Sequence, residues 1–448
     1  MENDVGRRRF VCGAAAASFL LLARSDAKAS GVPGRELGVR PGAPHDQTEV
    51  LQAAIDRTAR DRQPLFLEPG AYQVGGLRLP VGAKLVGVRG VTRLMAASAA
   101  PILAAERADH ISIKDLVLDG RGHAAGPRGV LEVTASHSVQ IEACEVINAG
   151  GTGIHLDGVQ GEVTRCVVQN ARHAGIFSID AAGLSITANT IGSCGNNGIQ
   201  IWRRKAGYDG TLVGSNRVHD IASRDGGSGQ NGNGINTFRA DSVIVAQNHL
   251  RNCAFSAVRA NASSNVQILG NNCKELGEVA LYIEFGYEGA VVANNIVDRA
   301  SIGLSATNFN EGGRLAVVQG NVFRNLVLPL SPGNDPDGGW GIGIHVEADA
   351  VVSGNLVERA SNVGLSLGWA KYLRDVSVTN NVIREAPIGV AVSVTPGTGA
   401  ALIKNNLITN ATRGAVVGFD RKVIVTGDLT QGATPPSSKA IIADNVVR

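Results

Sequence analysis

The chain repeats one short pattern of apolar and polar positions twelve times. Each copy has two apolar residues, a small polar residue that is usually Asn, an apolar pair, and then often Gly followed by Ile, Val or Leu. Most copies lie 22 to 26 residues apart, and the longer intervals of 27, 32, 34 and 39 residues contain Gly, Pro and charged insertions. A repeat of this length predicts a solenoid. The polar position falls at Cys144, Cys166, Asn189, Asn216, Asn248, Asn271, Asn295, Asn321, Asn355, Asn381, Asn406 and Asn445.

The apolar runs within each copy are short and have a period of two, as in Val351-Val352, Leu356-Val357 and residues 364–367. Such runs predict β-strands, because no copy has room for an amphipathic helix of about ten residues. Asn tolerates left-handed backbone and bonds to neighbouring main chain, so one Asn per coil predicts a stacked ladder at a corner. Small residues five positions later fit a tight interior corner: Ala149, Ala171, Cys194, Cys253, Ala300, Ala360, Ala386 and Ala411.

This pattern resembles the right-handed parallel β-helix of the pectin-lyase-like superfamily, from about residue 102 to residue 448. The resemblance implies an all-β, single-stranded right-handed parallel β-helix of about 12 coils. We therefore expect residues 102–448 to form the β-helix and residues 30–101 to form an N-terminal cap with the first strands.

The expected cap contains a helix over residues 47–60. Asp46 and Glu49 have the spacing of a capping box. In folds that the chain resembles, such a helix covers the first coil, which would otherwise leave an open sheet edge. Its predicted buried stripe consists of Leu51, Ala54, Ile55 and Thr58.

The first 29 residues have the features of an export signal. Arg7-Arg8-Arg9-Phe10 precedes an apolar run over residues 11–23, and Ala27-Lys28-Ala29 offers a cleavage site before Ser30. The run is too short for a membrane span, so we expect no stable membrane insertion. The paired arginines resemble a twin-arginine signal, which implies the Tat export machinery as a partner and a periplasmic or secreted product. The alternative is a basic tail with an unrelated apolar helix.

The signal and the repeats together resemble a family of twin-arginine-exported β-helix repeat proteins, which implies a location and a fold but no activity. Composition agrees with the fold, because Gly makes up 57 of 448 residues and aromatics only 4%. Removing residues 1–29 leaves 37 basic and 36 acidic residues, a net charge of +1. This balance gives no reason to expect nucleic acid as a partner.

Five cysteines remain after residue 29. Cys144 and Cys166 occupy the same position on successive coils, where a strand spacing of about 4.8 Å permits a disulfide by distance. We favour buried structural thiols, with a Cys144–Cys166 disulfide as the alternative in an oxidising compartment. The spacing of the cysteines and histidines predicts no metal site, and we expect no cofactor.

The strand after each repeated Gly is expected to line the binding groove that the resemblance implies. Alternate residues of a strand point to opposite faces, so the second and fourth residues after Gly point outward. On successive coils these are His155 and Asp157, Phe177 and Ile179, Gln200 and Trp202, Asn236 and Phe238, Arg259 and Asn261, Tyr282 and Glu284, Ser305 and Thr307, His345 and Glu347, Ser366 and Gly368, and then Ala391, Ser393 and Val416.

The middle coils of this row gather aromatic, amide and cationic side chains. Aromatic rings stack on sugars, and amides and Arg bond to hydroxyls and carboxylates, so the row predicts polysaccharide binding. Long loops over residues 203–211, 222–233 and 327–340 are expected to wall the groove. The alternative is that the aromatic residues only cover the sheet beneath the loops. The expected substrate-binding residues are Gln200, Trp202, Arg203, Asn236, Phe238, Arg239 and Asn261.

Two chemistries are compatible with this row. In a lyase or epimerase, Arg259 would pair with a uronate carboxylate, and Tyr282, a Lys or His345 would remove the adjacent proton. In a hydrolase, Glu284 and Glu347 would flank the scissile bond from positions two coils apart, about 10 Å by strand spacing, with His345 beside Glu347.

The family's signature motifs do not decide between these chemistries. The sequence lacks the Asn-Thr-Asp, Asp-Asp and Gly-His-Gly motifs of polygalacturonases, the aspartate cluster of calcium-dependent pectate lyases and the Asp-Pro-His-Asp motif of mannuronan epimerases. A non-catalytic β-helix that binds glycan or scaffolds envelope partners therefore remains the alternative to an enzyme.

Overall fold

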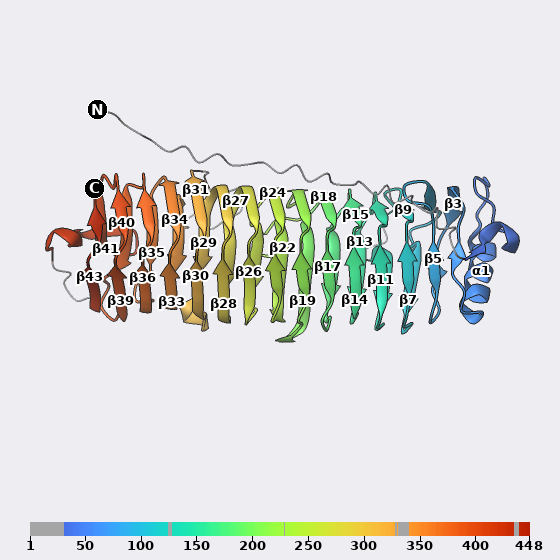
Figure 1. The fold of residues 1–448 in the computed structure, drawn as a ribbon, viewed down its shortest axis with the longest axis horizontal. Coiled ribbons are helices and arrows are strands. Elements are labelled where there is room, and N and C mark those ends of the chain that lie inside the picture. Colours follow the sequence, from blue (N-terminus) through green and yellow to red (C-terminus); the bar gives the residue numbers. More distant parts are fainter. Residues whose placement is uncertain (1–30, 124–127, 228, 328, 330–339, 434–438) are drawn as a thin grey trace, which may run out of the picture. The chain divides into compact units, whose positions relative to one another are not determined.

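The computed structural model describes residues 31–123, 128–227, 229–327, 329, 340–433 and 439–448. Residues 31–448 form one unit, in which the strands wind into coils that stack along a single axis (Figure 1). The strands belong to a 16-stranded and a 28-stranded sheet. Among the described strands, every ladder is parallel except the one between β41 (Gly414–Asp420) and β42 (Val423–Asp428). The predicted all-β parallel β-helix is therefore confirmed.

The coils align their strands in three rows. The first row is the 16-stranded sheet, from β1 (Val32–Pro33) to β43 (Lys439–Ala443). The second row adjoins the asparagine corner, from β3 (Gly70–Val74) to β44 (Val446–Val447). The third row carries the outward positions of interest and consists of β4 (Leu77–Arg78), β7 (Leu103–Glu106), β10 (Gly129–Thr134), β13 (Thr152–Asp157), β16 (Ala174–Ile179), β19 (Asn197–Tyr208), β22 (Asn233–Asp241), β25 (Val258–Asn261), β27 (Asn272–Glu284), β29 (Ile296–Ala306), β32 (Ile342–Val346), β35 (Val363–Leu367), β38 (Ile388–Ser393) and β41.

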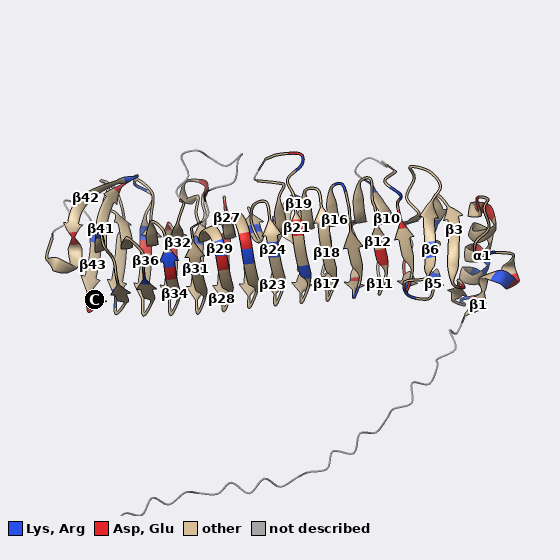
Figure 2. Cartoon of the chain, turned by 90° about the horizontal axis from the view of Figure 1, so that it is seen from above, with Lys and Arg blue, Asp and Glu red and all other residues tan. Residues whose placement is uncertain are grey.

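The core is a set of stacked aliphatic side chains inside the coils. Ile154, Ile176, Ile199 and Ile235 pair in register on successive strands, and each is fully buried. Parallel strands in register bring like side chains together, so one apolar position repeated in the sequence becomes a continuous apolar column. Charged residues are spread over strands as well as turns and loops, and most of the strand surface between them is uncharged (Figure 2).

The predicted asparagine ladder is confirmed. Asn216 donates its Nδ2 to the Ile186 carbonyl at 2.9 Å and to Asn248 Oδ1 at 3.0 Å, and its backbone N–H donates to the same Oδ1 at 2.9 Å. This arrangement repeats from coil to coil and satisfies buried amide and carbonyl groups at the corner. The bonded series consists of Asn189, Asn216, Asn248, Asn271, Asn295, Asn321, Asn355, Asn381, Asn406 and Asn445.

One expectation about this corner is wrong. The ladder asparagines do not adopt left-handed backbone; the residue before each polar position does, with φ from +53° at Ala143 to +66° at Gly320. The turn is therefore made one residue earlier, by residues as different as Arg165 and Gln247. Asn occupies the ladder position because its amide both donates and accepts inside the coil.

The helix of the cap is α1 (Thr48–Arg60), with Leu51, Ala54, Ile55 and Thr58 buried as predicted. Asp46 accepts the Thr48 N–H at 2.7 Å, and Gln47 occupies the N-cap position. The winding begins before residue 102, because β3 already pairs with β6 (Thr92–Ala96) and β4 with β7. The cap segment thus contributes coils as well as the helix.

The five described cysteines are buried free thiols. Cys144 and Cys166 donate to backbone carbonyls inside the coil, of Ile113 and Ile141 respectively, both at 3.5 Å. The predicted signal peptide lies outside the described residues. Within the described residues, no helix is long and apolar enough to cross a membrane.

Candidate functional site

The strand register places the predicted outward positions in two continuous side-chain rows on the third row of strands. Val416, which we expected at the end of one of them, lies in the core, and Val417 takes its place. The second side-chain row, two residues further along each strand than the first, includes Asp157, Trp202 and Glu284. The first side-chain row consists of His155, Phe177, Gln200, Asn236, Arg259, Tyr282, Ser305, His345, Ser366, Ala391 and Val417.

Four half-buried rings form an aromatic stripe along the N-terminal part of these rows: His155, Phe177, Trp202 and Phe238. Neighbouring ring centroids are 5.3, 5.4 and 5.6 Å apart. Trp202 donates its indole N–H to Asn236 Oδ1 at 2.6 Å, which fixes the ring against the sheet. Asn236 is itself buried, whereas the Trp202 and Phe238 rings remain partly exposed.

The predicted cations beside the stripe already bond to the chain itself. Arg204 pairs with Asp157 and Asp180 at 2.7 and 2.5 Å. Arg203 donates to the Ala181 carbonyl at 2.9 Å. Arg239 lies over the ring of Phe238, 4.6 Å from its centroid. These cations therefore already interact with other groups of the protein, and these contacts stabilise the neighbouring loops.

Arg259 lies at the centre of a buried ionic cluster. Its guanidinium bonds to both carboxylate oxygens of Glu284 at 2.7 and 2.8 Å and to Glu278 at 3.0 Å, and it lies over the Tyr282 ring, 4.6 Å from the centroid. Asn261 also donates to Glu284, at 2.7 Å. Arg259 is only 5% exposed, so its charge is balanced by carboxylates of the same chain.

Glu278 is the member of this cluster that the sequence pattern missed. The register of β27 shifts between Leu276 and Val279, which breaks the alternation by which outward positions were identified. Burial raises the pKa of Glu278 to about 7, although Arg259 opposes the shift. Burial also raises the pKa of Tyr282, with the Glu284 charge adding to the shift, so the phenol stays protonated near neutral pH.

A groove of about 880 Å³ lies further along the rows than predicted, over β27, β29, β32, β35, β38 and the β41–β42 hairpin. Of the predicted catalytic residues, Tyr282, His345 and Glu347 line it, with Glu278. Predicted residues that do not line it are Arg259, Glu284, Gln200, Trp202, Arg203, Asn236, Phe238, Arg239 and Asn261.

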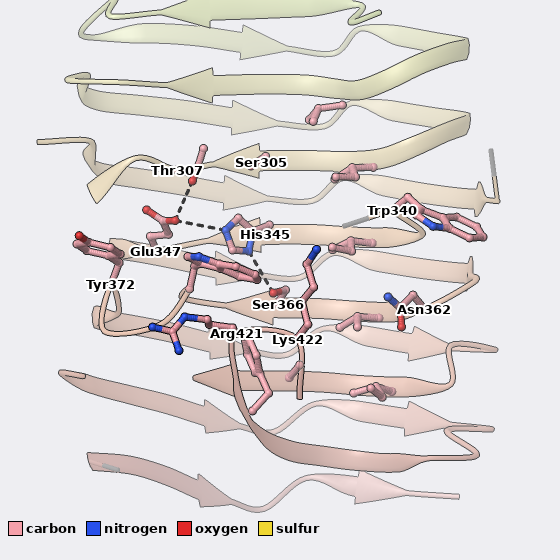
Figure 3. Close-up of a pocket in the computed structure, with 18 of the residues that line it drawn as sticks. Ser305, Thr307, Trp340, His345, Glu347, Asn362, Ser366, Tyr372, Arg421 and Lys422 are labelled. Carbon is pink, nitrogen blue, oxygen red and sulfur yellow. Dashed lines mark hydrogen bonds and ion pairs between the residues drawn. The ribbon is translucent and has the colours of Figure 1, made fainter. Parts of the chain in front are cut away.

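The floor of the groove carries a connected set of polar groups (Figure 3). His345 Nδ1 lies 3.1 Å from Ser366 Oγ, and His345 Nε2 lies 3.6 Å from Glu347 Oε1. Glu347 accepts from Thr307 Oγ1 at 2.8 Å and from the Phe309 N–H at 2.7 Å. Burial alone would raise the pKa of Glu347, but these hydrogen bonds and the nearby imidazole outweigh it and hold the pKa below its usual value.

The walls come from segments that follow or precede the strands. Trp340 and Trp369 are 46% and 37% exposed and line the groove together with Tyr372. The tip of the β41–β42 hairpin contributes Arg421 and Lys422 (Figure 3). The period-two pattern could not find these residues because none lies at a repeated position. Of these residues, only Trp340 lies in a loop that was expected to wall the groove.

Among the described residues, no group of three or more His, Cys, Asp and Glu side chains could hold a metal ion. In the groove, His345 and Glu347 bond to each other and to neighbouring donors. An imidazole between a carboxylate and a hydroxyl can take part in acid–base or nucleophilic chemistry.

Comparison with known proteins assigns the architecture. A family model described as a right handed beta helix region matches residues 109–218. Gene product 12 of bacteriophage phi29 in its pre-mature form is similar in structure, with a TM-score of 0.55 and 14% identity over 92% of this chain and 57% of that chain. The present chain thus spans little more than half the length of that protein.

Two further solved structures are similar. The A-module of the Azotobacter vinelandii mannuronan C-5 epimerase AlgE6 has a TM-score of 0.50 and 18% identity, over 71% of this chain and 98% of that one. The catalytic unit of a GH87 α-1,3-glucanase from Streptomyces thermodiastaticus has a TM-score of 0.51 and 14% identity, over 93% and 69%. The fold of this chain is a right-handed parallel β-helix.

Proposed function

We propose that this protein binds an acidic polysaccharide along the groove and processes it there. The observation that carries the proposal is the combination of exposed aromatic rings, Trp340 and Trp369, with the cations Arg421 and Lys422 around one groove. Aromatic faces suit sugar rings, and the cations suit carboxylate groups. Proteins of the same fold include a mannuronan epimerase and an α-1,3-glucanase, which supports a glycan as the ligand class.

The proposed binding path extends beyond the groove. The aromatic stripe lies on the same two rows, on the coils before Arg259, so a long glycan that runs along the coil axis would meet the stripe and then the groove. Trp202 and Phe238 keep their expected role as binding residues in this scheme. Asn236 holds the Trp202 ring by accepting its indole N–H.

For lyase-like chemistry, Arg259 is poorly placed to neutralise a uronate because Glu284 and Glu278 already bond to it. Lys422 and Arg421 are the groove cations that would replace it, with His345 as the base. For glycoside hydrolysis, the predicted pair of Glu347 and Glu284 is poorly placed, because the Glu284 carboxylate is bound to Arg259 and Asn261 and does not line the groove. The same groove without turnover would serve a glycan-binding or scaffold protein of the envelope.

The place of action is proposed from the first 29 residues. Their twin-arginine pattern supports export by the Tat machinery to the periplasm or the medium. Extracellular or envelope polysaccharides would then be within reach of the groove.

Calorimetric titration with a panel of polymers tests the binding proposal. We expect alginate or polygalacturonate to bind and neutral glucans to bind more weakly, with Trp369→Ala reducing affinity about tenfold or more through the lost stacking surface. Tyr208→Ala is the matched control, because Tyr208 is 67% exposed and does not line the groove. Failure of every polymer to bind, or equal affinity of Trp369→Ala and the parent protein, would refute the proposal. Ultraviolet absorbance and reducing-end assays on the same mixtures report lyase and hydrolase products.

A further inference from the structure

Three side chains on the groove floor form a line of hydroxyl, imidazole and carboxylate. Ser366 lies on β35 and His345 on β32, and the two residues are direct partners in the strand register. Ser366 Oγ is 3.1 Å from His345 Nδ1, and the other ring nitrogen is 3.6 Å from Glu347 Oε1. This order is that of a nucleophile, its base and the group that orients the base.

The line is held in place from both ends. Glu347 is 5% exposed and fixed by Thr307 Oγ1 and the Phe309 N–H, so its carboxylate cannot turn away from the imidazole without losing two hydrogen bonds. Ser366 is 7% exposed, and its strand is fixed on both sides by β32 and β38. The geometry is therefore preorganised by the sheet rather than by a mobile loop.

We propose that Ser366, His345 and Glu347 form a catalytic triad that hydrolyses an ester substituent on the glycan bound in the groove, an activity that rests on the binding function proposed above. A serine nucleophile acts on acyl groups, whereas cleavage of a glycosidic bond needs a pair of carboxylates around it. The ester of a sugar hydroxyl with a small carboxylic acid is the substrate class that fits both the triad and a glycan groove.

The reaction takes two balanced steps. Ser366 Oγ attacks the acyl carbonyl while its proton passes to His345, the ester C–O bond breaks, and the sugar hydroxyl leaves with the proton from His345. Water then attacks the acyl-serine, His345 takes one proton from that water, and the carboxylic acid is released as Ser366 regains its proton. Glu347 stabilises the imidazolium that forms in each step.

The surroundings of Ser366 suit such a substrate. Ile342, Val363 and Ile388 line the groove on one side of the floor and offer an apolar surface for a short acyl chain. Asn362 and Lys422 also line the groove and carry nitrogen donors.

Two assays on the full-length protein test the triad. The first measures acetate release from an O-acetylated polyuronate and hydrolysis of 4-nitrophenyl acetate. We expect turnover in the parent protein and a loss of about a thousandfold or more in kcat/KM in Ser366→Ala and His345→Ala. Glu347→Gln should change the pH profile of the rate as well as its size. Ser377→Ala, a serine on the opposite sheet, should behave as the parent protein.

The second assay treats the parent protein with a fluorophosphonate and maps the adduct by mass spectrometry, which does not depend on any variant folding. An adduct on Ser366 of the parent protein supports the triad. Glycan binding with no adduct and no acyl release would overturn the triad and leave the binding function standing. Labelling of Ser366 in a protein that binds no glycan would support the triad and refute the binding function.

Discussion

At the scale of single residues, the alternation of apolar and polar residues predicted which side chains lie in line on neighbouring strands. It did not predict which of these side chains bond to each other. The outward placement of Arg259, Tyr282 and Glu284 followed from a period of two, and the strand register confirms it. The bidentate pairing of Arg259 with Glu284 depends on side chains from neighbouring coils, which a single copy of the repeat does not reveal. Glu278 escaped notice because an irregularity in β27 moves it out of the pattern.

For the ladder asparagines, the sequence predicted the bonding partners as well as the positions. Their positions and stacking were predictable because a buried polar residue at a fixed interval needs a partner at the same interval. Of the two reasons expected for Asn, hydrogen bonding to neighbouring main chain is confirmed, whereas the demand for left-handed backbone does not fall on the asparagines. The structure assigns that demand to the preceding residue, where even Arg165 adopts φ +55°.

Glu278 leads to a prediction for the pH dependence of stability. Burial raises the pKa of its carboxyl from the ordinary 4.5 to about 7 in the folded protein. The folded state thus keeps a proton that the unfolded chain releases, so the contribution to stability is complete below about pH 4.5 and is lost as pH rises through about 7. We expect the free energy of unfolding of the parent protein, relative to Glu278→Gln, to fall over this range.

Urea unfolding followed by circular dichroism at several pH values measures this difference. Glu311→Gln, at an exposed position outside the cluster, serves as the control and should give a curve parallel to that of the parent protein. A constant difference between Glu278→Gln and the parent protein across the whole pH range would contradict the prediction.

At the scale of elements, the groove lies where irregular segments meet the regular rows. The repeat pattern placed the centre of the site over β19 to β27, where long loops follow the strands. The groove instead forms over the coils near β32 and β35, whose outward positions carry fewer aromatic and cationic residues. It forms there because the β41–β42 hairpin closes its C-terminal side. An antiparallel hairpin has no counterpart in the repeat, so periodicity could not predict it.

The hairpin tip carries a prediction about ligand charge. Arg421 and Lys422 are exposed and line the groove, so Arg421→Glu/Lys422→Glu should lower affinity for a polyuronate about tenfold or more while leaving the fold intact. The difference should shrink at high salt, since exposed charges are screened. Arg78→Glu/Lys84→Glu makes the same change in net charge far from the groove. Equal losses of affinity in both double variants, measured by calorimetry, would argue against a local role.

At the scale of the whole molecule, the fold was the most predictable property. Each coil repeats the same inward aliphatic positions and the same corner. One copy of the pattern would be weak evidence for the fold, but twelve copies at a regular interval predict it strongly. The extent of the winding was less predictable. The coils near α1 lack the asparagine corner, so the repeat pattern did not reveal them.

In a solenoid, the loss of an interaction in one coil should destabilise only that coil and its neighbours, because each coil contacts only the next ones. Asn271→Ala removes the acceptor for both Asn248 amide groups and the donor to the Val245 carbonyl, all in the interior. Because unpaired buried polar groups are costly, we expect the free energy of unfolding to fall by about 2 to 4 kcal/mol. Hydrogen exchange should rise around Asn248 and Asn295 but not in α1. Asn310→Ala, at an exposed asparagine, is the control, and an unchanged stability for Asn271→Ala would count against the ladder's energetic role.

The chain contains three tryptophans, and all of them lie on one side of the coils: Trp202 in the aromatic stripe, and Trp340 and Trp369 at the groove. Intrinsic fluorescence excited at the indole band therefore reports on this side of the molecule and is blind to the opposite sheet. A sugar that stacks on either indole will shift emission without any label. The protein thus carries its own optical reporter where a ligand would dock.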